Sequence, residues 1–197
     1  MERKEPKRRI YRATAMAVAM AFAGIAGCTT TGPQDTGSYV AKNNSIDSGV
    51  DATLTRLYDA APSSRELVAR AAGVLVFPSV LNVGLVVGGE HGDGALRVNG
   101  ATIGYYTTSG GSIGLQAGAQ TKAEIILFMT PESLEKFRAS HGWTAGADAT
   151  IAIAHIGANG AVDTETAKHP IVGFVLTNTG LMAGVSLEGA KYTKMPS

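Results

Sequence analysis

The chain has 197 residues, and its 17 Lys and Arg against 16 Asp and Glu give a formal net charge of +1 at pH 7. A chain of this length suits one domain with a full apolar core. The near balance of charge argues against the broad basic surface of a nucleic-acid-binding protein, and the single cysteine excludes an internal disulfide framework.

The first 27 residues have the layout of a secretory signal. Six basic residues fall between Arg3 and Arg12, and an Ala-rich apolar run follows from Ala13 to Gly27. This run is shorter than the roughly 20 apolar residues that a membrane-spanning helix needs. We therefore predict that residues 1–27 form a leader that is removed and plays no part in the fold.

The cysteine lies directly after this leader. Ile25-Ala26-Gly27-Cys28 resembles the lipobox of bacterial lipoproteins, in which the cysteine sulfur receives a diacylglycerol and becomes the mature N-terminus. We interpret Cys28 as the site of lipid attachment. The alternatives, a buried inert side chain or a reactive thiol, leave the basic and apolar leader unexplained. In lipoproteins Asp after the cysteine favours the inner membrane, so Thr29 indicates the outer membrane, with the domain facing the periplasm.

Loss of the leader leaves 11 basic and 14 acidic residues, a net charge of −3. The residues that follow Cys28, up to about Ser45, are rich in Thr, Gly, Ser and Asn, a composition that buries too little apolar surface to stay ordered. We therefore expect residues 28–45 to form a flexible tether and residues 46–197 to form a single domain.

Two helices are expected at the start of this domain. Apolar residues recur every three or four positions from Ile46 to Tyr58, with Ser45 as a possible cap. A second helix is expected after Pro62, with Ser63 and Glu66 as a capping box and an apolar side that begins at Leu67. Packing of both helices against the domain is favoured over their lying on a membrane.

From Gly73 onward, nearly every segment is strand-like and punctuated by glycine. Asn99-Gly100 is a strong hairpin pattern, and the short spacing favours an antiparallel sheet that is curved or closed. The expected strands are Val74–Phe77, Asn82–Val87, Ala95–Val98, Ala101–Thr107, Ser112–Gln120, Glu124–Met129, Thr150–His155, Ile171–Thr177 and Leu181–Glu188. The fold class is therefore α+β, with mostly antiparallel, strongly curved or barrel-like β structure.

Two segments within this β region have distinct patterns. Glu124–Met129 lacks polar alternation, so we expect a central strand buried on both faces. A third helix is predicted between Thr130, a suitable N-cap, and Gly142, a suitable end. Glycines on one side of the strands, such as Gly118, indicate close backbone packing.

No segment favours catalysis. Gly88–Gly94, "GGEHGDG", lacks the following helix or Lys-Ser/Thr pair of a phosphate-binding loop, so we interpret it as a turn between strands. The four histidines have no metal-ligand spacing, and His155 is expected at the surface. We predict neither enzymatic activity nor a cofactor nor a metal.

Several stretches together resemble the SYLF domain family in its bacterial lipoprotein form. They are "GVLVFPSV" from Gly73, "VGGEHGDGALRVNG" from Val87, "GLQAGAQ" from Gly114, "LFMT" from Leu127 and "GLMAGVSLEG" from Gly180. The resemblance covers most of the chain from Leu67 to Tyr192. It implies a non-catalytic lipid-binding module, since eukaryotic relatives bind phosphoinositides and some also bind actin filaments.

Membrane phospholipids are therefore the expected ligands, and a partner protein of the cell envelope is the alternative. Ala72 stands where relatives often have a basic residue, and their membrane-binding helix has no clear counterpart here. Because the mature chain is acidic, lipid contact requires a local basic cluster or an apolar surface. The candidates are Lys191 and Lys194, expected to be neighbours in a turn or helix, and Arg65 and Arg70 on the second helix.

Overall fold

The structure is a computed structural model that describes residues 36–84, 87–113, 118–155, 161–163, 165–182 and 185–196. The predicted leader, Cys28 and the first part of the predicted tether lie outside the described residues. The chain divides into the units Met1–Thr36 and Gly37–Ser197, and the elements below belong to the second apart from the first residue of α1. The helices are α1 (Thr36–Ala60), α2 (Ser64–Arg70), α3 (Pro131–Ala139) and the short 3₁₀ helix η1 (Thr166–Lys168).

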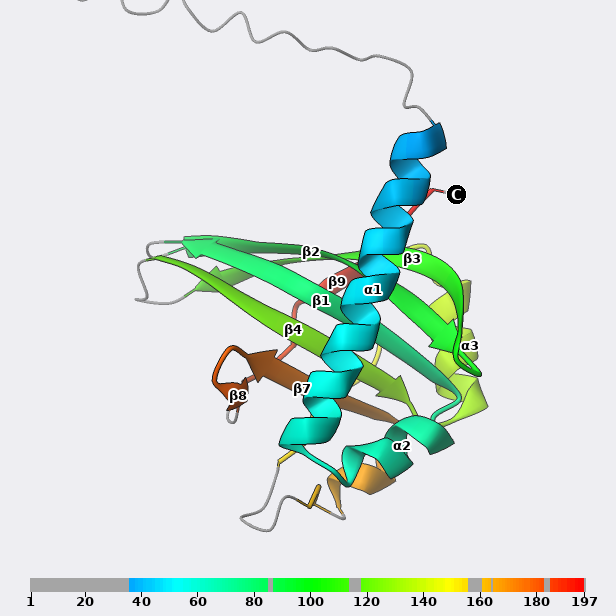
Figure 1. Ribbon diagram of the computed structural model, residues 1–197. Helices are drawn as coiled ribbons and strands as arrows, with labels where there is room; N and C mark the ends of the chain where they lie inside the picture. The colour runs from blue at the N-terminus through cyan, green and yellow to red at the C-terminus, as the bar shows by residue number, and fades with distance from the viewer. Residues whose placement is uncertain are drawn as a thin grey trace, which may run out of the picture. The chain divides into compact units, whose positions relative to one another are not determined.

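A curled, mostly antiparallel sheet forms the body of this unit (Figure 1). Its strands are β1 (Gly73–Gly84), β2 (Val87–Val98), β3 (Ala101–Ile113), β4 (Gly118–Phe128), β5 (Trp143–Thr144), β6 (Ala152–Ile153), β7 (Ile171–Thr177), β8 (Gly180–Leu181) and β9 (Lys191–Lys194). The order across the sheet is β5-β9-β3-β2-β1-β4-β7-β6, with β8 paired to β7 and only the β6–β7 pair parallel among these strands. The predicted α+β class with a curved antiparallel sheet is confirmed.

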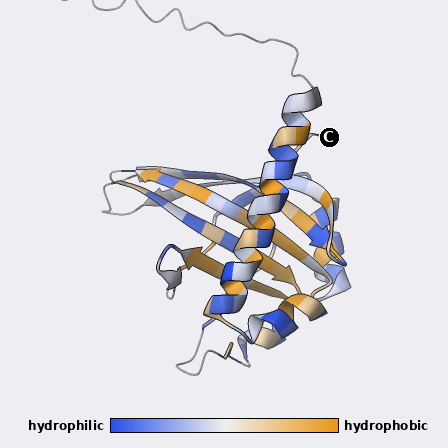
Figure 2. Cartoon of the chain, in the orientation of Figure 1, coloured by the Kyte–Doolittle hydropathy of each residue, from blue (hydrophilic) through white to orange (hydrophobic). Residues whose placement is uncertain are grey.

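Both faces of the middle strands are buried, which explains their unbroken apolar sequences. Along β1, Val74 and Val76 belong to a core under α1 and α2, whereas Leu75 and Phe77 belong to a second core that includes residues of α3. β4 lies between β1 and β7, and its residues from Ile125 to Phe128 are fully buried. The expectation of a central strand there is confirmed, and Figure 2 shows the hydrophobic colour of β1 and β7.

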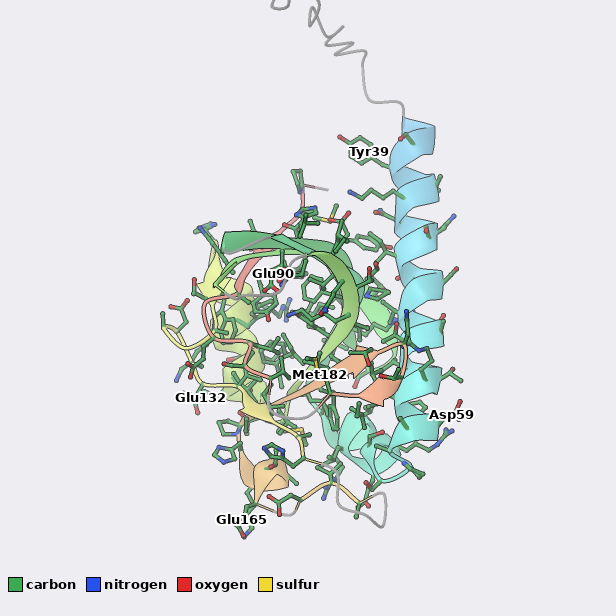
Figure 3. All side chains as sticks on the ribbon, turned by 90° about the vertical axis from the view of Figure 1, so that its left-hand side faces the viewer. Tyr39, Asp59, Glu90, Glu132, Glu165 and Met182 are labelled. Atoms are coloured by element: carbon green, nitrogen blue, oxygen red, sulfur yellow. The ribbon has the colours of Figure 1, made fainter. Side chains whose placement is uncertain are left out.

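The long helix α1 crosses the convex face of the sheet (Figures 1 and 3). Its predicted apolar stripe is confirmed, because Ile46, Val50 and Leu57 are buried. The predicted start at Ser45 is wrong, since the helix begins at Thr36. Residues 37–44 are mostly exposed and show no buried apolar stripe, and Lys42 among them forms an ion pair to Asp93 on β2 that no local pattern reveals. Within the described residues, no helix is long and apolar enough to cross a membrane.

The ends of the shorter helices differ in part from expectation. The capping box of α2 is wrong, because the Ser63 side chain makes no cap hydrogen bond and instead accepts one from the backbone N–H of Val162 at 3.0 Å. The predicted start of α3 is confirmed, with Thr130 accepting from the backbone N–H of Ser133 at 3.2 Å. α3 ends at Ala139, before Gly142, because Ser140 turns to an extended conformation.

Gly88–Gly94 lies within β2, so its interpretation as a turn is wrong. Two of its glycines, Gly92 and Gly94, lie against β1 on either side of the bulge at Pro78, where β1 continues as a strand. A Cβ on Gly94 would overlap with the Val76 carbonyl oxygen and lie 2.5 Å from Phe77 Cδ1. The close backbone packing inferred from glycine placement therefore occurs at Gly94. The packing around Gly118 is outside what the structure describes, so that prediction stays untested.

The remaining strands are partly as expected. The Asn99-Gly100 hairpin is confirmed, with both residues at positive φ, 50° and 80°. The expected strand Ser112–Gln120 is instead the end of β3 and the start of β4, with residues 114–117 outside the described set. Of the expected strand Leu181–Glu188, only Leu181 is in a strand among the described residues.

Candidate functional site

The two predicted lysines lie on β9 but do not form one cluster. In the register with β3, Lys191 is opposite Ser109 and Lys194 is opposite Tyr106. Because side chains alternate along a strand, these two lysines point to opposite faces of the sheet. The expectation that they are neighbours in a turn or helix is therefore wrong, and only Lys194 faces the side where Tyr106 is buried.

The two predicted arginines lie apart from these lysines, on α2. Both are exposed, and each has a local contact. The guanidinium carbon of Arg65 is 4.4 Å from the centroid of the Tyr58 ring, and Arg70 Nη1 is 3.9 Å from Glu66 Oε1. Such exposed contacts contribute little free energy. The structure thus does not unite the arginines and the lysines in one basic patch.

Lys194 lines a surface pocket of about 310 Å³ between α3 and the β3–β9 pair. Its walls are Ile103, Tyr106, Glu135, Arg138, Ala139 and Lys194. The Tyr106 ring packs against Phe137 of α3 with 5.0 Å between ring centroids, which fixes the base of the pocket. Ile103 is 40% exposed, so an apolar side chain stands open beside the charged ones.

The pocket gathers two cations and one carboxylate. α3 contains an ion pair between Lys136 and Glu132, but Glu135, Arg138 and Lys194 join no ion pair within 4 Å in the described part of the chain. Burial raises the pKa of the Tyr106 hydroxyl, and the nearby charge of Arg138 partly opposes that rise. The pocket can therefore supply charged hydrogen-bond donors and one acceptor to a small polar group.

A second group of charges lies on the concave side of the sheet, where Figure 3 places Glu90 inside the curve. Lys122 Nζ is 2.9 Å from both Glu90 Oε2 and Glu124 Oε1, and the Tyr192 hydroxyl donates to Glu124 Oε2 at 3.4 Å. Glu124 is fully buried, and the side chains of Lys122 and Glu90 are 16% and 11% exposed. The group joins β2, β4 and β9.

Burial is the largest single influence on the pKa values of Glu124, Lys122 and Tyr192. It raises the pKa of Glu124, and the attraction of Lys122 only partly opposes that rise. Burial alone would lower the pKa of Lys122, but the carboxylates of Glu124 and Glu90 outweigh it and leave that pKa raised. Burial and the two carboxylates also raise the pKa of Tyr192 well above its ordinary value. One lysine ammonium thus neutralises two carboxylates in a site of low dielectric, and burial favours the protonated form of Glu124.

Sequence reasoning missed the residues of both sites except Lys194. The positions Lys122 and Glu124 are two apart on a strand, so alternation alone could have placed them on one face. Arg138 and Glu135 are three apart on α3, which puts them on one side of the helix. Their convergence with β9 and β2 depends on strand pairing between distant segments. His155 is exposed as expected, and the described residues contain no group of three or more His, Cys, Asp or Glu that could hold a metal.

Comparison with known families gives a match to part of the chain. Residues 109–196 match the family model Ysc84, described as a Las17-binding protein actin regulator. This segment of the chain is a SYLF (Ysc84) domain. A search of curated proteins finds no match.

The SYLF match includes β4, α3 and β9, and hence Lys122, Glu124, Arg138 and Lys194. It begins within β3, so the resembling stretches between Gly73 and Gly100 lie before it. The SYLF family is associated with binding to lipids and to protein regulators of actin, and its members are generally binding modules rather than catalysts. The expected SYLF family is therefore confirmed over residues 109–196, and its bacterial lipoprotein form stays a prediction.

Proposed function

We propose that this protein is a non-catalytic lipoprotein of the bacterial cell envelope whose SYLF domain binds phospholipids. Acyl chains on Cys28 attach it to the outer membrane, and the domain faces the periplasm. Two acyl chains add roughly 0.8 kcal/mol of membrane affinity for each buried methylene, which is enough for stable attachment. The observation that carries the lipid-binding proposal is the pocket with Arg138, Lys194 and exposed Ile103 inside a domain of this family.

This pocket meets the need for a local basic site in an acidic mature chain. Two cations without a described ion-pair partner border it, and an exposed apolar side chain lies beside them. A phospholipid presents the complementary groups, a phosphate next to apolar glycerol and acyl carbons. The net charge of the pocket is small, because one carboxylate offsets one of its two cations. We therefore expect weak binding with modest salt dependence.

Vesicle co-sedimentation tests the proposal with a chain that begins at Thr29 and so lacks the anchor. Such a chain keeps every member of both cores, because all of them lie between Ile46 and Tyr192. We expect it to sediment with vesicles of mixed phosphatidylethanolamine and phosphatidylglycerol. Absence of binding at lipid concentrations far above the protein concentration contradicts the proposal.

An envelope protein partner is the second candidate, and one observation favours it. On the convex face beyond α1, Leu81 and Val83 of β1 are 47% and 53% exposed. Contiguous exposed apolar surface is typical of protein contact sites, and these two side chains are neighbours on one face of β1. Changing both to Ser, with no effect on vesicle binding but loss of a co-purifying protein, would favour this alternative.

A further inference from the structure

We propose that the pocket between α3, β3 and β9 binds a phospholipid headgroup that carries both a phosphate and a primary ammonium group, as in phosphatidylethanolamine. This inference rests on the proposed lipid binding and assigns its site and its headgroup. The pocket charges are those of Arg138, Lys194 and Glu135. Two cations and one carboxylate are the complement of a headgroup with one anionic and one cationic end.

The cations suit a single phosphate. Arg138 offers a planar fork of N–H donors, and Lys194 offers a compact ammonium on the opposite wall. Charge-assisted bonds to a phosphate are among the stronger hydrogen bonds that a surface pocket forms. Because neither cation has a described ion-pair partner, a phosphate need not displace one.

Glu135 determines which amine group the headgroup phosphate can bear in this pocket. It lies three residues before Arg138 on α3, so both side chains emerge from the same side of the helix. An ionised carboxylate accepts hydrogen bonds and donates none, so it binds an ammonium N–H and repels a second phosphate. A choline headgroup has no N–H to donate. The pocket should therefore distinguish ethanolamine from choline, although both headgroups are zwitterionic.

The dimensions and frame of the pocket fit this ligand. About 310 Å³ lies at the lower end of the range for small-molecule sites, which suits a headgroup rather than a whole lipid. The backbone of Lys194 pairs with Tyr106, and Tyr106 packs on Phe137 of α3. The two walls are thus held together through a buried aromatic contact, and Ile103 at the rim can meet the glycerol carbons.

The test compares phosphatidylcholine vesicles with vesicles in which part of the lipid is replaced by phosphatidylethanolamine, using the chain that begins at Thr29. Since the two lipids carry the same net charge, general electrostatic attraction is matched. We expect tighter binding to the ethanolamine vesicles. Lys194→Gln should weaken that binding by about tenfold, the effect of one charge-assisted hydrogen bond. Glu135→Gln should remove the preference for ethanolamine over choline while leaving binding to the choline vesicles.

The matched control is Lys191→Gln, which removes the same charge from the same strand on its opposite face. It should leave binding unchanged. All three positions are exposed, so the melting temperatures of the variants should match that of the parent chain. Soluble phosphoethanolamine should compete with the vesicles better than phosphocholine or inorganic phosphate does, which separates a headgroup site from a site for free phosphate.

Any of four results overturns the inference. One is vesicle binding that is unaffected by Lys194→Gln, which leaves the proposed lipid binding intact and removes the pocket from it. Another is a preference for phosphatidylglycerol over phosphatidylethanolamine, or competition by inorganic phosphate equal to that by phosphoethanolamine. The last is no binding to any vesicle, which overturns the proposed function itself.

Discussion

Replacing Lys122 by Met should destabilise the domain strongly. The lysine ammonium lies 2.9 Å from Glu90 Oε2 and 2.9 Å from Glu124 Oε1, and all three side chains are at least four-fifths buried. Met fills a similar volume but leaves two carboxylates facing each other without a cation. Removing one partner of a buried ion pair costs about 3–5 kcal/mol. For a domain of this size the loss corresponds to a fall of roughly 6 to 20 °C in melting temperature.

The pH dependence distinguishes this electrostatic cause from a packing defect. Burial already raises the pKa of Glu124, so this carboxyl becomes neutral as the pH falls, and the penalty of the Lys122→Met variant should shrink with it. Thermal unfolding of parent and variant over a series of falling pH provides the measurement. Lys168→Met removes the lysine of an exposed pair with Glu165, where the distance is 2.6 Å, and should change little. A loss at Lys122 that is equally small, or independent of pH, would refute the reasoning.

Three further predictions concern the same domain. Gly94→Ala should cost about 1–3 kcal/mol by overpacking against the Val76 carbonyl and the Phe77 ring, whereas Gly111→Ala, with open space around its Cβ, should unfold at nearly the parental temperature. The raised pKa of Glu124 means that the folded state holds its proton more tightly than the unfolded state. The free energy of unfolding that protonated Glu124 contributes is therefore fully present below the ordinary pKa of Glu and is lost as the pH rises through the pKa of Glu124 in the folded state. Glu124→Gln should flatten this decline of stability with pH in a series of unfolding curves. Cys28→Ser should release the protein from membranes, and a native N-terminal peptide without acyl chains in mass spectrometry would contradict the anchor.

Local sequence patterns were sufficient for much of the fold. The apolar run of Glu124–Met129 indicated a central strand, and Asn99-Gly100 indicated a hairpin, because both depend on neighbouring residues. The long extension of α1 before Ser45 was missed because its support includes the ion pair between Lys42 and Asp93, which are far apart in the sequence. The Gly88–Gly94 segment was taken for a turn because the bulge that Gly92 and Gly94 pack against is on β1.

The candidate site was predictable only in part. Lys194 was identified as a basic residue near the end of the chain, but its grouping with Lys191 required a turn or helix where the structure has a strand. Arg138 and Glu135 were not singled out, because nothing local to α3 shows that it packs beside β9. The same holds for Glu90, Lys122 and Glu124, whose approach depends on the pairing of β1 with both β2 and β4.

Native mass spectrometry of the full-length protein, extracted from membranes in a mild detergent, tests most directly whether this domain binds phospholipid. Covalent acyl chains at Cys28 and a noncovalent lipid in the domain differ in this measurement, because only the second is removed by gentle activation of the gas-phase ion. We expect a fraction of the protein to carry one intact phospholipid in addition to its acyl chains, and this fraction should fall in the Lys194→Gln variant but not in Lys191→Gln. Protein that carries its acyl chains and no additional phospholipid, even with phospholipid added to the detergent, would contradict lipid binding by the domain.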